Sequence, residues 1–295
     1  EGWRRGLTLR WYYDKPKNVD MFLYGINPIG KFFSLSNDEK THFFYRSRGD
    51  LFSTDAIKIT LDKMLTKENL IKNNVRTPLG KSFKYLEFHN KGGKYAKEIG
   101  YPVVVKPTFG SLGKGVFTSV KNKEELISAA EHIYNEHKYD DILIEQYIQG
   151  EEYRVYVVNH EVVACTKKIP ANVIGDSKST ISQLIEHKNE LRKNNPHLSK
   201  KLITVDKRLI NYLKDKNMDL NTVLEEGQYE YIGNVAYTSV GGDSLNVSIE
   251  DVPDSIKTEA VKSLKSLPSA PNAGIDTILS DGQAYIIEIN ATAAY

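Results

Sequence analysis

Residues 101–115, YPVVVKPTFGSLGKG, place a lysine directly before closely spaced glycines, and that combination can bind phosphate. The first six residues suit a buried strand that ends at Lys106. The loop that follows contains three glycines, Gly110, Gly113 and Gly115. Such a loop can bring backbone N–H groups to an anion while the strand fixes the lysine ammonium. The pattern is neither a P-loop, which needs glycine at Thr108, nor the kinase loop, which needs glycine at Thr118. A glycine-rich turn without a ligand is the competing interpretation.

The C-terminal segment YIIEIN (285–290) places Glu288 and Asn290 two residues apart on a predicted strand, so their side chains share a face. Asp276 lies on the preceding predicted strand. Two carboxylates and an amide oxygen are hard ligands that suit Mg²⁺ rather than zinc. The competing interpretation is that these are exposed polar residues on a half-buried strand.

The register of this hairpin decides whether the two carboxylates meet. A two-residue loop at 281–282 would pair Asp276 with Ile287 and turn the aspartate to the other face. A three-residue loop, 281–283, would pair Asp276 with Glu288. We therefore predict the three-residue loop, with Gly282 at positive φ.

Composition limits the classes of protein that this chain can be. Its 295 residues suffice for about two domains. Forty Lys and Arg balance 38 Asp and Glu, which argues against a nucleic-acid binder. No apolar run approaches the roughly 20 residues of a membrane span, and no signal peptide is visible. The single cysteine, Cys165, excludes an intrachain disulfide, fits a reducing cytoplasm and is predicted to be a buried small hydrophobe.

The elements that must position these groups follow from periodicity and turn signals. Residues 1–60 are rich in aromatics and read as strands and loops, and residues 193–232 are polar and lysine-rich. Helical spacing over 61–74 involves Leu61, Met64, Leu65, Glu68 and Ile71. The other predicted elements are a helix capped by Asn122 with Glu125, a strand at 141–148, a hairpin around Asn159-His160, a helix from Thr180 to about Arg192, a helix at 260–267 and a hairpin around Asp281-Gly282. Strands and helices mix without strict alternation, which favours an α+β fold.

Several of these elements stand in a characteristic order. Lys63 opens a helix, Lys106 precedes the glycine loop, EQYIQGEEYR (145–154) follows, and the Asp…Glu-x-Asn pattern ends the chain. This order resembles the ATP-grasp superfamily of carboxylate–amine ligases, and most closely the branch that holds cyanophycin synthetase and the glutathione synthetase part of the bifunctional glutathione enzyme. Residues 167–189 and 233–253 are also similar to that branch, and the resemblance covers about 61–295.

The resemblance implies an ATP-grasp fold, in which two α+β lobes grip ATP. Residues 1–60 would be a partial N-terminal domain, 61–145 the small lobe with a glycine-rich flap, and 146–295 the C-terminal lobe with a metal site. The implied reaction joins a carboxylate to an amine through an acyl phosphate and releases ADP and phosphate. The implied partners are amino acids or short peptides, without nucleic acid or membrane, and a homo-oligomer is a further hypothesis.

The resemblance also implies roles for individual residues. The ATP phosphates would be bound by Lys63, Lys106 and the flap residues Gly110, Ser111, Leu112, Gly113 and Gly115. The nucleoside would be bound by Glu145 at the adenine amino group, the backbone of Gln146, Tyr147 and Ile148, and Glu152 at the ribose. Lys168 would neutralise the transferring phosphoryl group, and Arg154 would bind the acyl phosphate or the substrate carboxylate. Asn234, Gly241 and Gly242 would cover the acceptor. Two Mg²⁺ ions, or Mn²⁺ as the alternative, would be held by Asp276, Glu288 and Asn290.

Two other classes of protein stay open. The first is a nucleotide-binding protein of this fold that has lost ligase activity. Three departures from the branch motivate this hypothesis. Lys168 stands where the branch has arginine, and the segment KSLPSAPNAGID replaces the usual smooth connection from helix to strand. The third departure is that the chain ends at NATAAY. The second is a lysine-rich interaction or nucleic-acid module at 188–216, in which Tyr212 is the only aromatic residue available for base stacking.

Overall fold

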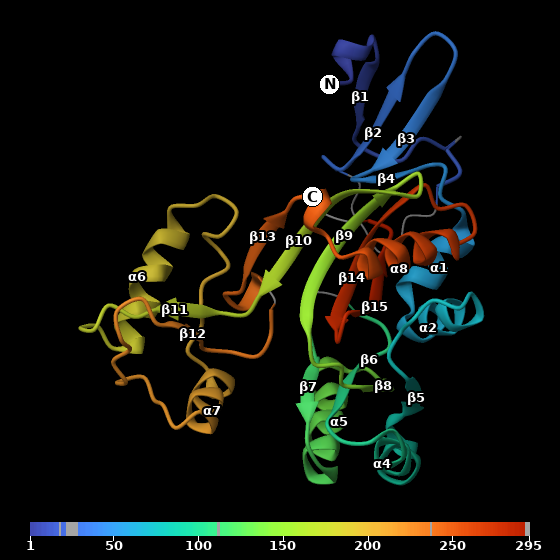
Figure 1. Cartoon of the computed structure of the whole chain (residues 1–295). Helices are drawn as coiled ribbons and strands as arrows, with labels where there is room; N and C mark the ends of the chain where they lie inside the picture. The colour runs from blue at the N-terminus through green and yellow to red at the C-terminus, as the bar shows by residue number, and fades with distance from the viewer. Residues whose placement is uncertain (18, 22–28, 111–112, 237, 293–295) are drawn as a thin grey trace.

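The fold is that of a computed structural model, which describes residues 1–17, 19–21, 29–110, 113–236 and 238–292. Figure 1 shows an N-terminal sheet, a small lobe, a large sheet with helices beside it, and a subdomain that projects to one side. Helices and strands mix along the chain, and the named strands pair antiparallel. The predicted α+β class is confirmed.

The N-terminal sheet has four strands in the order β1-β2-β3-β4. Its strands, preceded by a 3-10 turn at Trp3–Arg5, are β1 (Thr8–Tyr12), β2 (Phe32–Ser36), β3 (Thr41–Tyr45) and β4 (Arg48–Gly49). Phe32 and Tyr45 are buried on one face with Val19 and Met21. This small separate core agrees with the prediction of strands and loops, apart from the residues of this region that lie outside the described ranges.

Two short helices follow, α1 (Thr54–Leu61) and α2 (Lys63–Lys72), each with a side-chain cap. Asp62 begins α2 by accepting from the backbone N–H groups of Met64 and Leu65. The predicted helix over 61–74 therefore exists, but α1 was not predicted. The apolar residues at helical spacing do not form the buried side of α2, because Leu65 and Ile71 are 44% and 54% exposed. The buried residues are Thr66, Lys67 and Leu70.

The small lobe is a four-stranded sheet in the order β5-β8-β6-β7, with helices packed on it. Its elements are β5 (Gly80–Lys84), α3 (Tyr85–Glu87), the π-helical turn η2 (Phe88–Gly92), α4 (Gly93–Ile99), β6 (Val103–Pro107), β7 (Phe117–Val120), α5 (Lys123–His137) and β8 (Asp141–Gln146). Asn122 caps α5 by accepting from the Glu125 N–H at 2.9 Å. The predicted strand that ends near Lys106 is confirmed as β6, and its Val103 and Val105 join the core of this lobe.

The large sheet has five strands in the order β13-β10-β9-β14-β15, and α8 (Asp254–Lys265) packs on one face. Its strands are β9 (Glu151–Val158), β10 (Glu161–Ile169), β13 (Asp243–Val247), β14 (Asn272–Ser280) and β15 (Gln283–Asn290). Alternate residues such as Val155 and Ile275 point into the core under α8. Their neighbours Arg154 and Asp276 therefore point to the opposite face, toward the small lobe.

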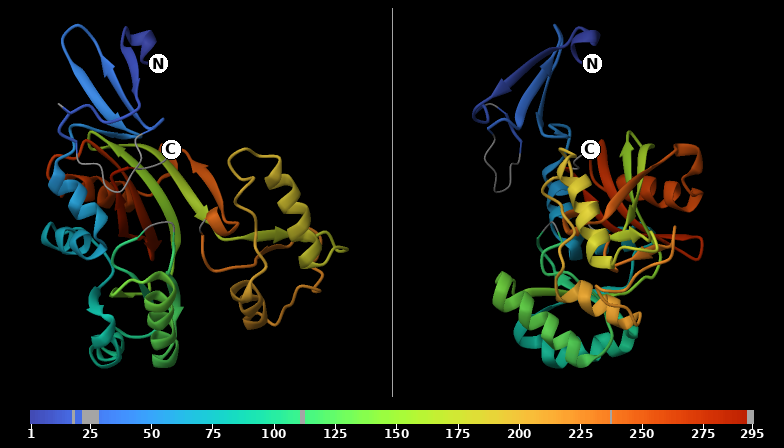
Figure 2. Two further views of the ribbon diagram at one scale, coloured as in Figure 1. Left: turned by 180° about the vertical axis from the view of Figure 1, so that it is seen from behind. Right: turned by 90° about the vertical axis from the view of Figure 1, so that its left-hand side faces the viewer.

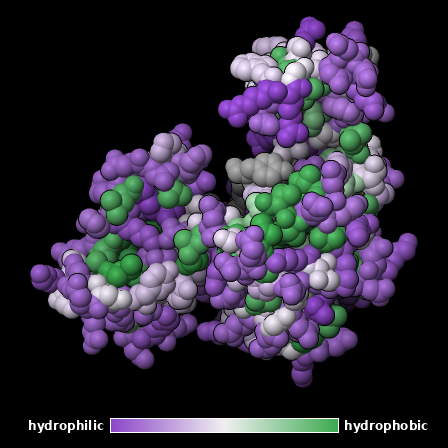
Figure 3. Space-filling view, turned by 45° about the horizontal axis from the view of Figure 1, so that its top comes forward, coloured by the Kyte–Doolittle hydropathy of each residue, from purple (hydrophilic) through white to green (hydrophobic). Residues whose placement is uncertain are grey.

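A subdomain lies between β10 and β13 in the sequence and projects away from the sheets (Figures 1 and 2). Its elements are β11 (Asn172–Ile174), α6 (Ile181–Lys193), α7 (Lys207–Asp215) and β12 (Tyr229–Tyr231), and the 3-10 turns Thr238–Val240 and Ile249–Asp251 flank β13. The predicted helix at Thr180 begins with a complete capping box to Gln183. The subdomain has a hydrophobic core of its own. In the space-filling view of Figure 3 it forms a separate mass with a largely hydrophilic surface.

The proposed domain boundaries at 60/61 and 145/146 stay a prediction. Phe52, Ala56 and Leu70 pack in the core of the large sheet rather than with the N-terminal sheet or the small lobe. The segment that contains α1 and α2 therefore joins the C-terminal half of the chain, and the small lobe begins at β5.

Candidate active site

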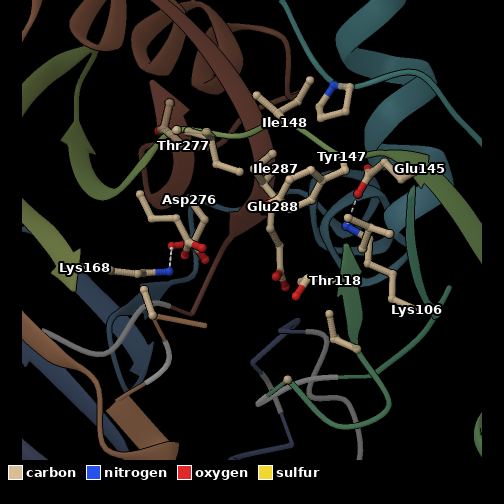
Figure 4. A pocket seen from close by; sticks show the side chains of 18 of the residues that line it. Lys106, Thr118, Glu145, Tyr147, Ile148, Lys168, Asp276, Thr277, Ile287 and Glu288 are labelled. Atoms are coloured by element: carbon tan, nitrogen blue, oxygen red, sulfur yellow. Dashed lines mark ion pairs between the residues drawn. The ribbon is translucent and has the colours of Figure 1, made fainter. Parts of the chain in front are cut away.

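A cavity of about 350 Å³ lies between the small lobe and the large sheet. Lys106 and Glu145 line it from the small lobe, while Lys168, Asp276 and Glu288 line it from the large sheet (Figure 4). Lys106 and the acidic strand, which the resemblance assigns to the phosphates and to the metal ions, therefore line one cavity.

The lysine wall is built at the start of α2 and the end of β6. The Lys63 ammonium donates to the carbonyl of Gly110 at 2.9 Å, and the Lys63 N–H donates to the carbonyl of Thr108 at 3.2 Å. Burial lowers the pKa of Lys63, and the negative charge of Glu288 opposes that shift. Lys106 is 5% exposed and its ammonium lies 2.5 Å from Glu145 Oε2. Two ammonium groups thus face one cavity.

Glu145 lies between two lysines, and one of them, Lys67, was not predicted. Glu145 Oε1 is 2.6 Å from the Lys67 ammonium, and Oε2 contacts Lys106. Burial alone would raise the pKa of Glu145, but Lys106 and Lys67 outweigh it and bring the pKa to about 2. The carboxylate is therefore ionised. Because both of its oxygens are held by lysines, a contact with an adenine amino group would have to be shared with them.

The acidic wall shows how Asp276 and Glu288 come together. Asp276 pairs with Glu288 across β14 and β15, as predicted, but the three-residue loop is wrong. The turn has two residues, Asp281 and Gly282, with φ of 48° and 73°. A β-bulge restores the pairing, because Asp276 faces Glu288 while the next residue of β14 faces Ile286. Ile287 is the extra residue, and it lets a tight turn and an aligned carboxylate pair coexist.

Three groups surround the Asp276 carboxylate. The Lys168 ammonium lies 2.7 Å and Arg154 Nε 3.5 Å from Asp276 Oδ1, and the Asn290 amide donates to Oδ2 at 3.3 Å. Within the described ranges, Asp276 Oδ1 and Arg154 Nε are buried without an aligned hydrogen bond. Arg154 reaches Asp276 because the two residues are direct neighbours on β9 and β14. A buried carboxylate oxygen with only ionic contacts can still accept a further cation or donor.

The donor chemistry of Asp276, Glu288 and Asn290 fits a hard divalent cation. The described residues contain no group of three or more His, Cys, Asp or Glu side chains arranged for a metal. The set is two carboxylates and one amide, and such sets bind Mg²⁺ with water and phosphate completing the shell. Figure 4 shows the Glu288 carboxylate pointing into the cavity on the side of Thr118.

The nucleoside residues predicted from the resemblance all belong to the wall of this cavity. The segment 145–148 and Glu152 all line it. Burial raises the pKa of Glu152, which the nearby Lys168 opposes, and burial also raises the pKa of Tyr147. Apolar side chains that were not predicted, including Val104 and Ile278, line the cavity with them. The roles of these residues stay predictions.

The three glycines of the loop after β6 all have positive φ. Gly110, Gly113 and Gly115 have φ of 129°, 70° and 69°, values that favour glycine. Gly110 and Gly113 line the cavity, whereas a Cβ on Gly115 would lie 3.1 Å from the ring of His137. Gly115 therefore serves close packing on α5. The predicted flap residues Ser111 and Leu112 lie outside the described residues.

The predicted acceptor residues do not all reach the cavity. Asn234 lines it, together with Tyr231, which was not predicted. Gly241 and Gly242 are absent from the lining among the described residues, as are Gly115, Arg154 and Asn290. Gly241 has φ of 96°, and a Cβ there would lie 2.5 Å from Ile203, so this glycine is required by packing on the subdomain.

A buried ionic network holds the strand after Gly242. Asp243 accepts from Lys188 at 2.7 Å, Arg192 at 2.6 Å and Asn172 at 3.0 Å. The pKa of Asp243 is lowered, because these donors outweigh the effect of burial. Arg192 also donates to the Gly242 carbonyl at 3.0 Å. The network fixes α6 to the start of β13, which is a structural role.

The cavity has Lys63 and Lys106 at one side and the paired carboxylates of Asp276 and Glu288 at the other, between two α+β lobes. Residues 60–293 match the model of the ATP-grasp domain, and the chain belongs to the ATP-grasp family. Among the described residues, no helix is both long and apolar enough to cross a membrane.

Two curated proteins are similar to this chain over most of its length. It is 32% identical to cyanophycin synthetase of Synechocystis sp. over 252 residues, which are 81% of this chain and 28% of that protein. It is 30% identical to the bifunctional glutathione biosynthesis protein of Clostridium perfringens over 258 residues, which are 86% of this chain and 32% of that protein. The chain thus spans about a third or less of the length of these relatives.

Solved structures confirm the fold. The bifunctional glutathione synthetase of Pasteurella multocida aligns with a TM-score of 0.59 and 23% identity, covering 90% of this chain and 36% of that one. The D-alanine–D-alanine ligase of Bacillus anthracis aligns with a TM-score of 0.54 and 18% identity, covering 81% of this chain and 59% of that one. The predicted ATP-grasp fold and the predicted family are both confirmed.

Proposed function

We propose that this chain is an ATP-dependent ligase that joins the carboxylate of an amino acid or short peptide to an amine, with ADP and phosphate as by-products. The observation that carries the proposal is the shared cavity, in which Lys63 and Lys106 face Asp276 and Glu288. A triphosphate needs cationic groups along its length and a site for the cations that accompany it. Both kinds of group line this cavity.

In the proposed reaction the substrate carboxylate attacks the γ-phosphorus of ATP, and ADP leaves. An amine then attacks the carbonyl carbon of the acyl phosphate, phosphate leaves, and an amide remains. Attack of one anion on another requires fixed positive charge. Lys63 and Lys106 supply it at the phosphates, and Lys168 and Arg154 supply it beside Asp276.

Asp276, Glu288 and Asn290 would hold Mg²⁺, or Mn²⁺ as the alternative, and such ions would neutralise phosphate charge when bound. The carboxylates already lie in one register across β14 and β15. Glu145, the backbone of 146–148 and Glu152 are the proposed nucleoside contacts, since these residues line the same cavity.

The alternative is a nucleotide-binding protein of the same fold without ligase activity. One observation favours it: Lys168, which stands where arginine was expected, contacts Asp276 Oδ1 at 2.7 Å. A lysine cannot grip a phosphoryl group through two parallel hydrogen bonds as arginine can. The substitution thus weakens one of the contacts that the transfer step needs.

The experiment is an ADP-release screen of the chain with ATP and Mg²⁺ over amino acids and dipeptides, with products identified by mass. Amino-acid-dependent ADP formation with an amide product supports the ligase, whereas ATP binding without turnover across the panel supports the alternative. Glu288→Gln should lower turnover at least about 100-fold, a typical loss for a group that stabilises transition-state charge. Its control is Glu250→Gln, an exposed glutamate outside the cavity lining among the described residues. Near-normal turnover in Glu288→Gln would refute the metal assignment.

A further inference from the structure

Lys67 is a buried lysine that the proposed reaction does not use. It lies on α2, one turn after Lys63, and is 2% exposed. Its ammonium contacts Glu145 Oε1 at 2.6 Å, Thr77 Oγ1 at 3.1 Å and the Pro78 carbonyl at 2.5 Å. A lysine ammonium has three N–H donors, so these contacts occupy all of them. This complete set of partners indicates that the fold specifically accommodates the charge of Lys67 in the interior.

The chain also leaves a space for this side chain. Gly80 on β5 faces Glu145 on β8 across the small-lobe sheet. A Cβ on Gly80 would lie 2.8 Å from Cε of Lys67 and 3.2 Å from the Ile144 carbonyl. Since the backbone carbonyl cannot move cheaply, any side chain at position 80 would displace Lys67.

Lys67 and Lys106 hold the same carboxylate from different surroundings. Lys106 lines the cavity, whereas Lys67 is outside the lining formed by the described residues. Among the described residues, the ion pair of Lys106 is with Glu145 Oε2 at 2.5 Å. Lys67 is held by three groups and Lys106 by one carboxylate. Lys106 can therefore turn to a ligand in the cavity while Lys67 keeps Glu145 in place.

The charges of Lys67, Glu145 and Lys106 indicate what Lys67 contributes to the site. Glu145 is ionised, so the set of two lysines and one glutamate carries a net charge of +1. Without Lys67, Glu145 and Lys106 would form a neutral buried pair, and Glu145 would lose this lysine partner whenever Lys106 turned to an anion. A buried carboxylate without a partner is strongly disfavoured.

We propose that Lys67 is a positioning residue that balances the charge of Glu145 and thereby frees Lys106 for the phosphates of a nucleoside triphosphate. This inference rests on the proposed binding of ATP in the cavity. Lys67 acts only through Glu145 and Lys106, so its removal should weaken binding of the phosphates more than binding of the nucleoside. Loss of a residue that supports a ligand typically costs about 10–100-fold in affinity, and we expect that range for ATP.

The test is calorimetric titration of the chain with ATP and Mg²⁺, and separately with adenosine. Lys67→Met should weaken ATP binding about 10–100-fold and adenosine binding less than about threefold. The control is Lys72→Met, an exposed lysine on the same helix, which should bind both ligands as the parent does. Equal weakening of ATP and adenosine would show a merely structural role and overturn the proposal.

A double-mutant cycle makes the test specific. If Lys67 acts through Lys106, Lys67→Met combined with Lys106→Met should bind ATP no more weakly than Lys106→Met alone. Additive losses would overturn the proposal. If Lys67→Met does not fold, Gly80→Ala provides the same comparison, because it displaces the Lys67 side chain. Failure of the parent chain to bind ATP would refute the proposed function, whereas normal ATP binding by Lys67→Met would refute this inference alone.

Discussion

Replacing Glu145 by glutamine should destabilise the fold in a way that depends on pH. Glu145 is 2% exposed, and both of its oxygens contact lysine ammonium groups, at 2.6 and 2.5 Å. Glu145→Gln keeps the size of the side chain but removes its charge, which leaves Lys67 and Lys106 buried without a counter-ion. The unfolded chain has no such requirement, so the substitution acts on the folded state.

The magnitude follows from the pKa of Glu145. Its ordinary value of 4.5 falls to about 2 in the fold. Each unit of pKa difference between the folded and unfolded chain is worth about 1.4 kcal/mol, so ionised Glu145 contributes roughly 3 kcal/mol at pH 7. The folded pKa is the lower one, so this stability is complete above about pH 4.5 and is lost as the pH falls toward 2. At pH 3 about half of it should remain.

Urea unfolding followed by far-UV circular dichroism measures this difference. Tryptophan fluorescence would not, because Trp3 and Trp11 lie in the N-terminal region, away from the small lobe. We expect Glu145→Gln to lower the free energy of unfolding by about 3 kcal/mol at pH 7 and by about half as much at pH 3. The exposed control Glu136→Gln should change it by less than about 0.5 kcal/mol at both pH values. A loss below 1 kcal/mol at pH 7, or an equal loss at both pH values, would refute the reasoning.

Three further predictions concern other parts of the chain. Asp243→Asn leaves Arg192, whose side chain is 3% exposed, without its charge partner, and should destabilise the subdomain by about 3 kcal/mol, seen as faster limited proteolysis there. Gly150→Ala places a Cβ 2.1 Å from the Leu279 carbonyl and should cost about 1–3 kcal/mol in thermal unfolding; an unchanged melting temperature would contradict it. Burial raises the pKa of Cys165 to about 11, so a thiol reagent at pH 8 should react only after denaturation, and rapid labelling of the folded chain would contradict this.

Local signals in the sequence predicted the parts of the fold that depend on neighbouring residues. Asn159 and His160 form the turn between β9 and β10 with φ of 47° and 67°, as the dipeptide indicated. Thr180 and Asn122 cap their helices through side-chain bonds to residues three positions later. These features could be predicted because the interacting groups lie within one turn of chain.

Features that depend on distant partners could not be predicted in this way. The sequence around Lys67 indicates a polar helix, which gives no reason to expect a buried lysine. Lys67 is buried because it pairs with Glu145, which lies 78 residues later in the chain. The bulge at Ile287 has no local marker, since a two-residue turn at Asp281-Gly282 usually continues in regular register. The prediction of paired carboxylates was correct, while the loop proposed to achieve it was wrong.

The connection between the lobes lies in the cavity itself. Residues 147–150 join β8 of the small lobe to β9 of the large sheet, and all four line the cavity. Gly150 packs directly on the backbone of β14, the strand that carries Asp276. The position of Lys106 relative to the carboxylates of Asp276 and Glu288 therefore depends in part on a segment that a ligand would touch. A ligand that contacts both walls must favour the lobe arrangement in which both contacts exist, because binding stabilises the state that it prefers.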